Sequence, residues 1–262
     1  MKRRTFLPLV PAAFLAGCGE KETGPKLTVG MEANYEPFEY HNEKGELDGV
    51  DVRIAEALAK HLKLPLKIEE YTFAGLIPAL QGGQIDCIIS AMTANDERRK
   101  SIDFSDSYVF TGIAMMVHKD APIHSAEDLK KPGLRVVAKV ATTGESYARE
   151  FMPQAASIRT LEDEKICAEE VAKNLADVFI YDQLSIRSHW KRHQDKTRAI
   201  LQPIREEQWA IGIKKGNDDL RNKINAFIKD FRDKGELDKL GDRYLKDEKE
   251  FLKEMGVPFV FR

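Results

Sequence analysis

Cysteine is scarce in this sequence, and the residues that bind metals are not grouped. The 262 residues include 3 cysteines and 6 histidines, with no Cys-x-x-Cys, no His-Glu-x-x-His and no histidine cluster. Such spacings hold zinc or carry out dithiol chemistry, so we expect no metal site and no cofactor. No spacing demands a disulfide between Cys87 and Cys167. We expect two free thiols, with a disulfide in an oxidising compartment as the alternative.

The sequence also lacks an excess of positive charge and a long hydrophobic stretch. Its formal net charge is −2, and without residues 1–18 it has 38 basic against 43 acidic residues, or −5. Nucleic-acid-binding proteins present a basic face, so we expect no nucleic-acid partner. No internal apolar run reaches the roughly 18 residues that a transmembrane helix needs. The length is sufficient for two lobes of roughly 100 residues each.

Residues 1–18 have the pattern of an export signal. A positively charged start precedes a short apolar stretch that two prolines interrupt. The Leu-Ala-Gly-Cys segment ending at Cys18 resembles a bacterial lipoprotein box, which implies cleavage before Cys18 and attachment of acyl chains such as palmitate. A plain signal peptide is the alternative. The pair Arg3 and Arg4 leaves a twin-arginine export route open beside the general one, and residues 19–25 are predicted to be a polar tether.

Strand and helix patterns alternate along the rest of the chain, which predicts a mostly parallel α/β sheet. The first unit contains predicted strands at 27–30, 64–70 and 85–89 and predicted helices from 51 and at 73–81. The second contains strands at 134–140, 157–161 and 178–181, each followed by a helix. Predicted strands at 109–117 and 209–213 lead out of the first unit and back into it. Two further helices, 217–235 and 236–245, precede a C-terminal tail.

One stretch has the features of a carboxylate site. A short apolar strand ends at the small residues Ser90 and Ala91, and the Thr93 hydroxyl and the Arg98 guanidinium follow. A guanidinium can donate two parallel hydrogen bonds to a carboxylate. The alternative is a solvated loop that caps a helix, with Arg98 in a surface ion pair with a neighbouring aspartate.

Short motifs occur in a fixed order over nearly the whole mature chain. They are Tyr35-Glu-Pro-Phe-Glu39, Gly49-Val-Asp51, Leu76-Ile-Pro-Ala-Leu80 with Gly83 and Asp86, Met92-Thr93 with Glu97-Arg98, Asp103-Phe-Ser-Asp106 with Tyr108, Thr142-Thr-Gly144 and Asp182. Together they resemble extracellular solute-binding protein family 3, the polar amino acid receptors of ABC importers. The resemblance implies a type II periplasmic-binding-protein-like α/β fold. Residues 26–111 and 208–262 would form one lobe and 112–207 the other, with a two-strand hinge and a ligand cleft.

The resemblance also implies roles for individual residues. Arg98 would hold the α-carboxylate of an amino acid, with Thr93 as a hydroxyl donor and Ala91 as a backbone donor. Asp182 would take the α-ammonium from the second lobe.

Further residues would complete this site. Thr142 and Thr143 would add donors at a helix N-terminus, where partial positive charge favours a carboxylate. Tyr35 and Phe73 resemble the aromatic walls beside the ligand side chain, with ordinary core packing as their alternative. Phe38 is assigned to the core.

Two charged residues leave the ligand's identity open. Glu32 stands where receptors for basic amino acids often carry an acid, whereas Lys139 stands where some glutamine receptors carry a lysine. A cation at Lys139 would repel a basic ligand, but the two groups could neutralise each other and present hydrogen-bonding atoms to an amide. Asn95 and Ala141 depart from the family pattern without removing a charged contact. We expect arginine or glutamine.

The expected function is therefore a monomeric receptor that is not an enzyme. It would be lipid-anchored to a bacterial membrane, facing the periplasm or the exterior, and would deliver its ligand to permease subunits. Two alternatives use the same fold: a periplasmic dehydratase of the prephenate or arogenate type, and an amino acid sensor. An enzyme would need a general acid, for which Glu32 or Asp182 could serve.

Overall fold

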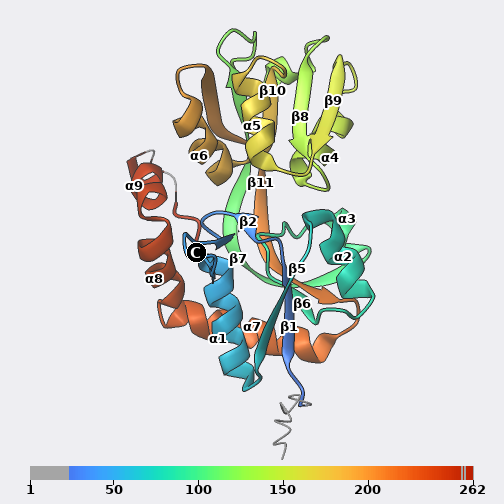
Figure 1. Cartoon of the computed structure of the whole chain (residues 1–262), viewed down its shortest axis with the longest axis vertical. Helices are drawn as coiled ribbons and strands as arrows, with labels where there is room; N and C mark the ends of the chain where they lie inside the picture. The colour runs from blue at the N-terminus through green and yellow to red at the C-terminus, as the bar shows by residue number, and fades with distance from the viewer. Residues whose placement is uncertain (1–23, 255, 257, 262) are drawn as a thin grey trace, which may run out of the picture.

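Two α/β lobes are joined by two long strands in the computed structural model, which describes residues 24–254, 256 and 258–261 (Figure 1). The joining strands are β7 (Ile102–His118) and β11 (Thr197–Lys214). The main sheet runs in the order β5-β1-β6-β11-β7-β10-β8-β9, so the joining strands lie at its centre. The predicted two-lobe architecture is confirmed.

The lower lobe in Figure 1 carries three parallel strands with helices around them. Its strands and helices are β1 (Leu27–Met31), β5 (Leu66–Glu70), β6 (Cys87–Ile88), α1 (Val50–Leu62), α2 (Phe73–Gln81), α3 (Asp96–Arg99), α7 (Asp218–Asp233), α8 (Glu236–Tyr244) and α9 (Lys246–Glu254). A small separate sheet contains β2 (Asn34–Tyr35), β3 (Glu39–His41) and β4 (Leu47–Asp48).

The upper lobe repeats the alternation of strand and helix. Strands β9 and β10 both pair with β8 in parallel. Its elements are a 3-10 helix (Ala126–Lys130), β8 (Arg135–Lys139), α4 (Thr143–Phe151), β9 (Ser157–Leu161), α5 (Glu164–Ala172), β10 (Val178–Asp182) and α6 (Gln183–His193).

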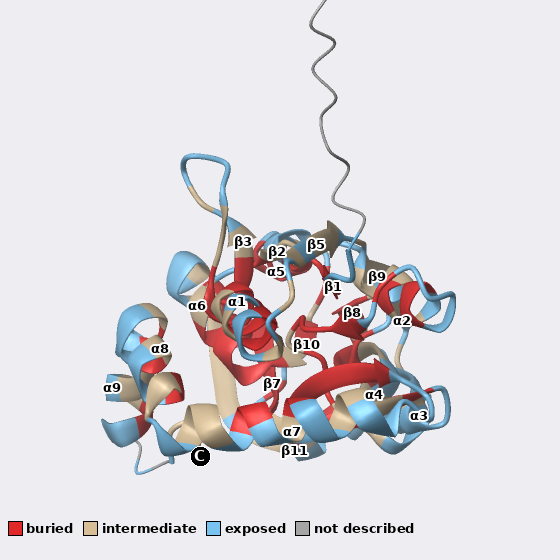
Figure 2. Cartoon of the chain, turned by 90° about the horizontal axis from the view of Figure 1, so that it is seen from below, coloured by how far each residue is buried: buried red, intermediate tan, exposed pale blue. Residues whose placement is uncertain are grey.

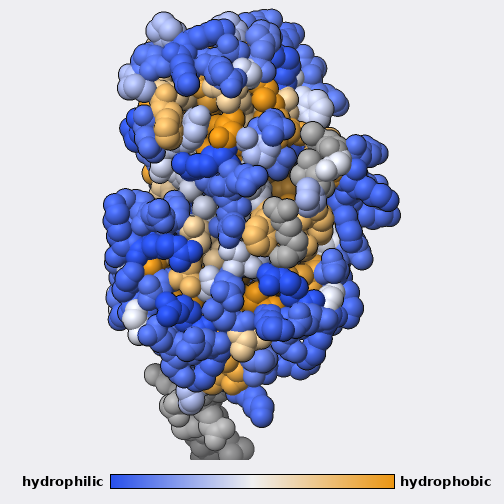
Figure 3. All heavy atoms as spheres, turned by 180° about the vertical axis from the view of Figure 1, so that it is seen from behind, coloured by the Kyte–Doolittle hydropathy of each residue, from blue (hydrophilic) through white to orange (hydrophobic). Residues whose placement is uncertain are grey.

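Several hydrophobic clusters stabilise the lobes, and one of the lower lobe also takes in Leu184 of α6. The lower clusters contain Val29 and Leu76, whereas the upper ones contain Val178 and Phe179, all fully buried. Phe38 is also fully buried, as predicted. Figure 2 shows buried residues on the central strands and exposed ones on the outer helix faces. The face in Figure 3 is mainly hydrophilic, with hydrophobic atoms in small areas.

The helix predicted from Asn217 shows how local sequence sets an element's start. The Asn217 side chain accepts a hydrogen bond from the Leu220 N–H at 3.2 Å, which satisfies a donor that the first helical turn leaves free. Ile224 and Phe227 then face the core of the lower lobe, one turn apart.

The joining strands are longer than predicted, because β7 begins at residue 102 rather than 109 and β11 at 197 rather than 209. Much of the early part of β11 is only half-buried, and its register against β7 shifts between Ile200 and Arg205. The regular alternation that identifies a strand in sequence is therefore weak there. The predicted lobe limits, 111/112 and 207/208, fall within these strands and stay predictions.

Two segments of the lower lobe that were predicted to be irregular contain regular structure. The predicted loop and turn after β1 contain the short strands β2 to β4, and the predicted tail contains helix α9. Leu252 of α9 is buried in the lower core, so tertiary packing orders a helix whose other residues are mostly charged.

Candidate functional site

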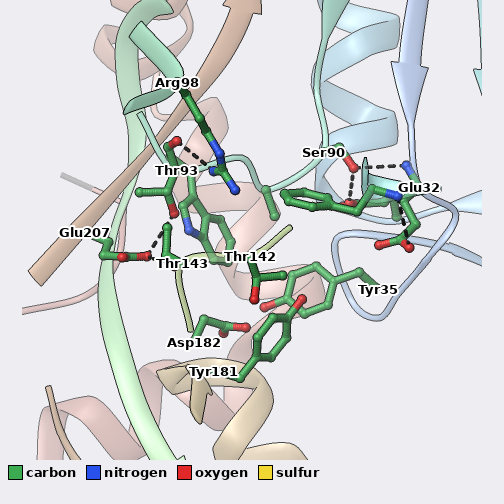
Figure 4. A pocket seen from close by; sticks show the side chains of 14 residues that line it. Glu32, Tyr35, Ser90, Thr93, Arg98, Thr142, Thr143, Tyr181, Asp182 and Glu207 are labelled. Atoms are coloured by element: carbon green, nitrogen blue, oxygen red, sulfur yellow. Dashed lines mark hydrogen bonds between the residues drawn. The ribbon is translucent and has the colours of Figure 1, made fainter. Parts of the chain in front are cut away.

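A pocket lies between the lobes, where strands of both end. Glu32 follows β1, and Asp182 is the last residue of β10. In open α/β sheets, ligands bind at the carboxyl ends of the strands. The pocket contains about 400 Å³ of space, including the part open to solvent. Its lining consists of Glu32, Tyr35, Glu39, Phe73, Ser90, Ala91, Thr93, Arg98, Thr142, Thr143, Tyr181, Asp182, Glu207 and Trp209 (Figure 4).

Nearly all the predicted site residues are in this lining, and Lys139 contacts it through Glu32. Glu39, Ser90, Tyr181, Glu207 and Trp209 were not predicted to belong to the site.

Arg98 is a cation whose hydrogen-bond acceptors in the described chain are backbone carbonyls. Its Nη1 donates to the Thr93 carbonyl at 2.8 Å, and its Nη2 donates across the cleft to the Ala141 carbonyl at 3.0 Å. No carboxylate of the described chain forms a salt bridge with Arg98, which removes the surface ion pair considered above. The Phe73 ring lies 5.2 Å from its Cζ. Burial lowers the pKa of Arg98 to about 10, although Glu207 acts in the opposite direction.

Asp182 is the matching anion on the opposite lobe. Its Oδ1 accepts a hydrogen bond from the Ser185 N–H at 2.9 Å, which caps α6. Within the described residues it has no salt bridge, and burial raises its pKa to about 7, with Glu164 adding to the effect. The buried Tyr35 hydroxyl points towards it (Figure 4), and no hydrogen bond of this hydroxyl to another described residue is formed. Burial, followed by the charge of Asp182, raises the pKa of Tyr35.

Glu207 joins the two lobes. Its Oε2 accepts hydrogen bonds from the Thr93 hydroxyl and the Thr143 hydroxyl, each at 2.9 Å, and its Oε1 accepts one from Arg205 at 2.9 Å. A hydroxyl has one proton and two lone pairs. Thr93 and Thr143, predicted as donors, therefore already donate to Glu207 and offer a ligand only lone pairs.

The Thr142 hydroxyl is occupied as well. It donates to the Lys139 carbonyl at 2.7 Å and accepts from the Glu145 N–H at 3.4 Å, capping α4. The contribution of Thr142 and Thr143 to a ligand carboxylate would therefore come from N–H groups at the start of α4.

Glu32, Lys139, Phe73 and Tyr181 form what we call the side-chain end of the pocket. Lys139 Nζ donates to Glu32 Oε2 at 2.5 Å, and the Phe73 and Tyr181 ring centres each lie 5.9 Å from Nζ. The Phe73 N–H donates to Glu32 Oε1 at 3.4 Å. The two charged residues therefore pair in this structure. Burial raises the pKa of Glu32, and Lys139 opposes that rise. The pKa of Lys139 is raised, since its acidic neighbours outweigh its burial.

Residues 27–247 match the bacterial extracellular solute-binding proteins, family 3. The chain belongs to this family. It is 31% identical over 259 residues to an arginine-binding extracellular protein of Bacillus subtilis (strain 168), covering 94% of this chain and 100% of the relative. It is 30% identical over 226 residues to an L-cystine-binding protein of Escherichia coli (strain K12), covering 86% and 84%.

Solved structures share the fold. An ancestral amino acid-binding protein, described as a precursor of cyclohexadienyl dehydratase, has a TM-score of 0.75 and 35% identity, covering 84% of this chain and 95% of its own. An ancestral arginine-binding protein has been solved bound to glutamine (TM-score 0.76, 30% identity) and bound to arginine (0.75, 31%), with 84% of this chain and 97% of that chain covered each time.

Two buried acids of this solute-binding protein lie at the pocket wall: Glu39, which is in the lining, and Asp51, which is not. The Ala91 N–H, predicted to face a ligand, donates instead to Asp51 Oδ2 at 2.7 Å, and Ala91 has φ of +45°. Tyr108 also donates to Asp51, and Ser90 donates to Glu39 at 2.7 Å. Burial raises the pKa of Asp51 to about 7 and that of Glu39 well above its usual value. Ala91 therefore lines the pocket without a free N–H.

The remaining expectations concern cysteines, metals and the membrane. Cys87 and Cys167 are buried and free, as expected. The described residues contain no group of three or more His, Cys, Asp or Glu that could hold a metal ion. In the same part of the chain, no helix is long and apolar enough to cross a membrane. Cys18, the signal over 1–18 and most of the tether lie outside the described residues.

Proposed function

We propose that this solute-binding protein is the receptor of an ABC importer, captures a polar or basic L-amino acid and delivers it to a membrane permease. The observation that carries the proposal is one pocket lined by the partly exposed guanidinium of Arg98 and the buried carboxyl of Asp182, neither of which forms a salt bridge within the described residues. An uncompensated buried charge costs several kcal/mol. A zwitterion brings a counter-charge to each of them at once.

The ligand backbone would be held from both lobes. Two of the five N–H groups of Arg98 are used by carbonyls, so the guanidinium still has donors for an α-carboxylate. Asp182 would take the α-ammonium, and lone pairs of the Thr93 hydroxyl would share it. Tyr35 and Phe73 would flank the ligand side chain.

Closure of the cleft would be the functional event. The lobes contact each other across the pocket in this structure, because Thr93 and Thr143 both donate to Glu207 and Arg98 donates to the Ala141 carbonyl. They would have to separate for an amino acid to enter. Hinge closure around a ligand follows from its stronger contacts in the closed form. The importer would then recognise the closed, loaded receptor.

Arginine or glutamine is the proposed ligand. The acid Glu32 suits a cationic side chain, and its pair with Lys139 offers hydrogen-bonding atoms to an amide. An arginine-binding relative and an ancestral protein bound to either amino acid support this choice. Glu32→Gln should weaken arginine binding far more than glutamine binding. Equal weakening would remove Glu32 from side-chain recognition.

The proposal includes the protein's place in the cell. The protein would be exported, cleaved before Cys18 and anchored there by lipid, facing the periplasm or the cell exterior. It would act as a monomer, without nucleic acid and without catalysis. Mass spectrometry of the mature N-terminus would test the anchor, because an unmodified Cys18 would contradict it.

Thermal-shift screening of the ligand-free protein tests the receptor role. The twenty amino acids, ornithine and citrulline would each be added, and we expect stabilisation by one or a few of them, with a dissociation constant of roughly 1 μM or lower, about −8 kcal/mol. No stabilisation by any of them would refute the assignment.

A dehydratase is the second candidate. It is favoured by the similarity to an ancestral protein described as a precursor of cyclohexadienyl dehydratase and by Asp182, whose pKa of about 7 suits proton transfer near neutral pH. Following prephenate or arogenate by absorbance would detect product release, which the receptor proposal does not expect.

A further inference from the structure

Glu164 is a buried acid that lies outside the pocket lining and beside Lys139. It lies in the first turn of α5 and is 4% exposed. Its Oε1 contacts the Ser185 hydroxyl at 3.2 Å and His189 Nε2 at 3.3 Å. Its Oε2 lies 3.7 Å from Lys139 Nζ and has no hydrogen-bond partner among the described residues. Burial, followed by the charge of Glu164, raises the pKa of the neighbouring Tyr181 hydroxyl. A buried acceptor without a donor is unfavourable, so the Oε2 of Glu164 is available to Lys139.

Lys139 therefore stands between two carboxylates. It contacts Glu32 Oε2 at 2.5 Å and lies 1.2 Å farther from Glu164 Oε2, at 3.7 Å. Its side chain is 1% exposed, so bulk water does not compete for the ammonium. With His189 neutral beside Glu164, one ammonium between two carboxylates leaves one excess negative charge. The flexible stem of lysine allows the ammonium to move between the two acids.

We propose that Glu164 is a positioning residue that sets ligand specificity through Lys139. When the ligand side chain is a cation, Lys139 moves to Glu164 Oε2, and Glu32 receives the cation of the ligand. When the side chain is an amide, Lys139 stays on Glu32. This inference rests on the proposed amino acid receptor and adds the class of ligand: a cationic side chain is preferred, and a neutral amide is accepted.

Charge balance and the aromatic rings explain the preference. A cationic ligand gives two ion pairs, Lys139 with Glu164 and the ligand with Glu32, and removes the excess charge. An amide leaves that charge in a buried site, where it is unfavourable. The space that the ammonium would leave lies near the Phe73 and Tyr181 rings, whose faces attract cations.

Glu164→Gln keeps the size of the side chain and removes its charge. Calorimetry with L-arginine and L-glutamine should show arginine affinity lowered by about tenfold or more and glutamine affinity changed by less than about threefold. The matched control is Glu162→Gln, which removes a charge from an exposed side chain two residues earlier. It should leave both affinities unchanged. Equal weakening of both amino acids by Glu164→Gln would overturn the inference.

A double-mutant cycle with Lys139→Met tests whether Glu164 acts through Lys139. Lys139→Met alone should raise the ratio of arginine to glutamine affinity, because Glu32 is then free for the ligand. Adding Glu164→Gln to that variant should not change the ratio further, since the group through which it acts is absent. An unchanged effect of Glu164→Gln in the Lys139→Met background would contradict the inference.

Two controls distinguish a wrong inference from a variant that does not fold and from a wrong proposed function. Circular dichroism would check folding. If Glu164→Gln does not fold, Glu164→Asp keeps the charge and should keep the preference for arginine, so its loss would contradict the inference. A wild-type protein that binds no amino acid would refute the proposed function and this inference together. Binding without the selective effect would refute the inference alone.

Discussion

The guanidinium of Arg98 and the carboxylate of Asp182 line one pocket from opposite lobes, and neither forms a salt bridge within the described chain. Burial lowers the pKa of Arg98 to about 10 and raises that of Asp182 to about 7. Burial disfavours a charged form unless a counter-charge compensates it. One ligand that carries both counter-charges would reverse both shifts.

Arg98→Ala should weaken amino acid binding by at least ~2 kcal/mol, because the ligand carboxylate would be buried without its donors. Calorimetry on the wild type and the variant measures this loss. Arg99→Ala is the control, since Arg99 is the neighbouring exposed arginine, whose Cζ lies 5.3 Å from the Phe104 ring outside the pocket. Unchanged affinity in Arg98→Ala would remove Arg98 from the site.

Binding should release a proton near neutral pH. In the ligand-free protein Asp182 is partly protonated at pH 7, because its pKa is about 7. An ammonium beside it favours the carboxylate, so affinity should rise between about pH 6 and 8. Calorimetry in buffers of different ionisation enthalpy measures the proton. The same proton count in Asp182→Asn would assign the effect to another group, such as Asp51.

Folding stability should show the opposite pH trend at this residue. Between about pH 4 and 7 the folded protein holds a proton on Asp182 that the unfolded chain has lost, so stability falls as pH rises. Asp182→Asn keeps a capping side chain and removes this dependence. Its stability relative to the wild type should increase by roughly 2–4 kcal/mol from pH 4 to 7. Urea unfolding at several pH values measures this change. If the pKa of Asp182 were not raised in the folded protein, the difference in unfolding free energy between the variant and the wild type would not increase with pH.

Sequence patterns could predict the fold and the part of the pocket between Ser90 and Arg98, since their signals are local. The buried run before Ser90 and the strand before Asp182 are visible as periodicity, and helix starts such as Asn217 are visible as capping residues. All these elements are present in the structure. Small residues at one strand end, Ser90 and Ala91, indicated a carboxylate site, whereas the role expected for Asp182 came from the resemblance to the family.

The missed residues depend on contacts between distant segments. Glu207 stands in a strand whose early part is only half-buried and irregular in register, so no periodic signal marked it. Glu164 looked like an ordinary first-turn acid of α5, and only packing shows that it lies 3.7 Å from Lys139. The prediction of a free backbone donor at Ala91 was wrong for a similar reason. The Ala91 N–H donates its hydrogen bond to Asp51, which lies 40 residues earlier in the sequence.

Gly112→Ala should destabilise the joining strands. A Cβ at this position would lie 2.7 Å from the Arg205 carbonyl oxygen and 2.7 Å from Pro203 Cβ, both on the neighbouring strand. Overpacking of this kind costs about 1–3 kcal/mol, which urea unfolding would measure. Gly24→Ala is the control, since nothing lies within 4 Å of its added Cβ. Equal stability of the two variants would show that the neighbouring strand shifts to make room for a Cβ at Gly112 without a cost in stability.

Glu207→Leu should shift the ligand-free protein towards the open form. Glu207 accepts hydrogen bonds from Thr93 on one lobe and Thr143 on the other, and opening the cleft would break at least one of them. A hydrogen bond to a charged group contributes about 1.5 kcal/mol or more, so the closed population should fall roughly tenfold relative to the open one.

Small-angle scattering of the Glu207→Leu variant without ligand should show a larger radius of gyration than that of the wild type. Calorimetry should show the same loss of affinity for every amino acid that binds. Glu206→Leu is the matched control, because it removes an exposed acid from the same strand and should leave both measurements unchanged. A selective loss for one amino acid, with unchanged scattering, would instead place Glu207 in ligand recognition and not in closure.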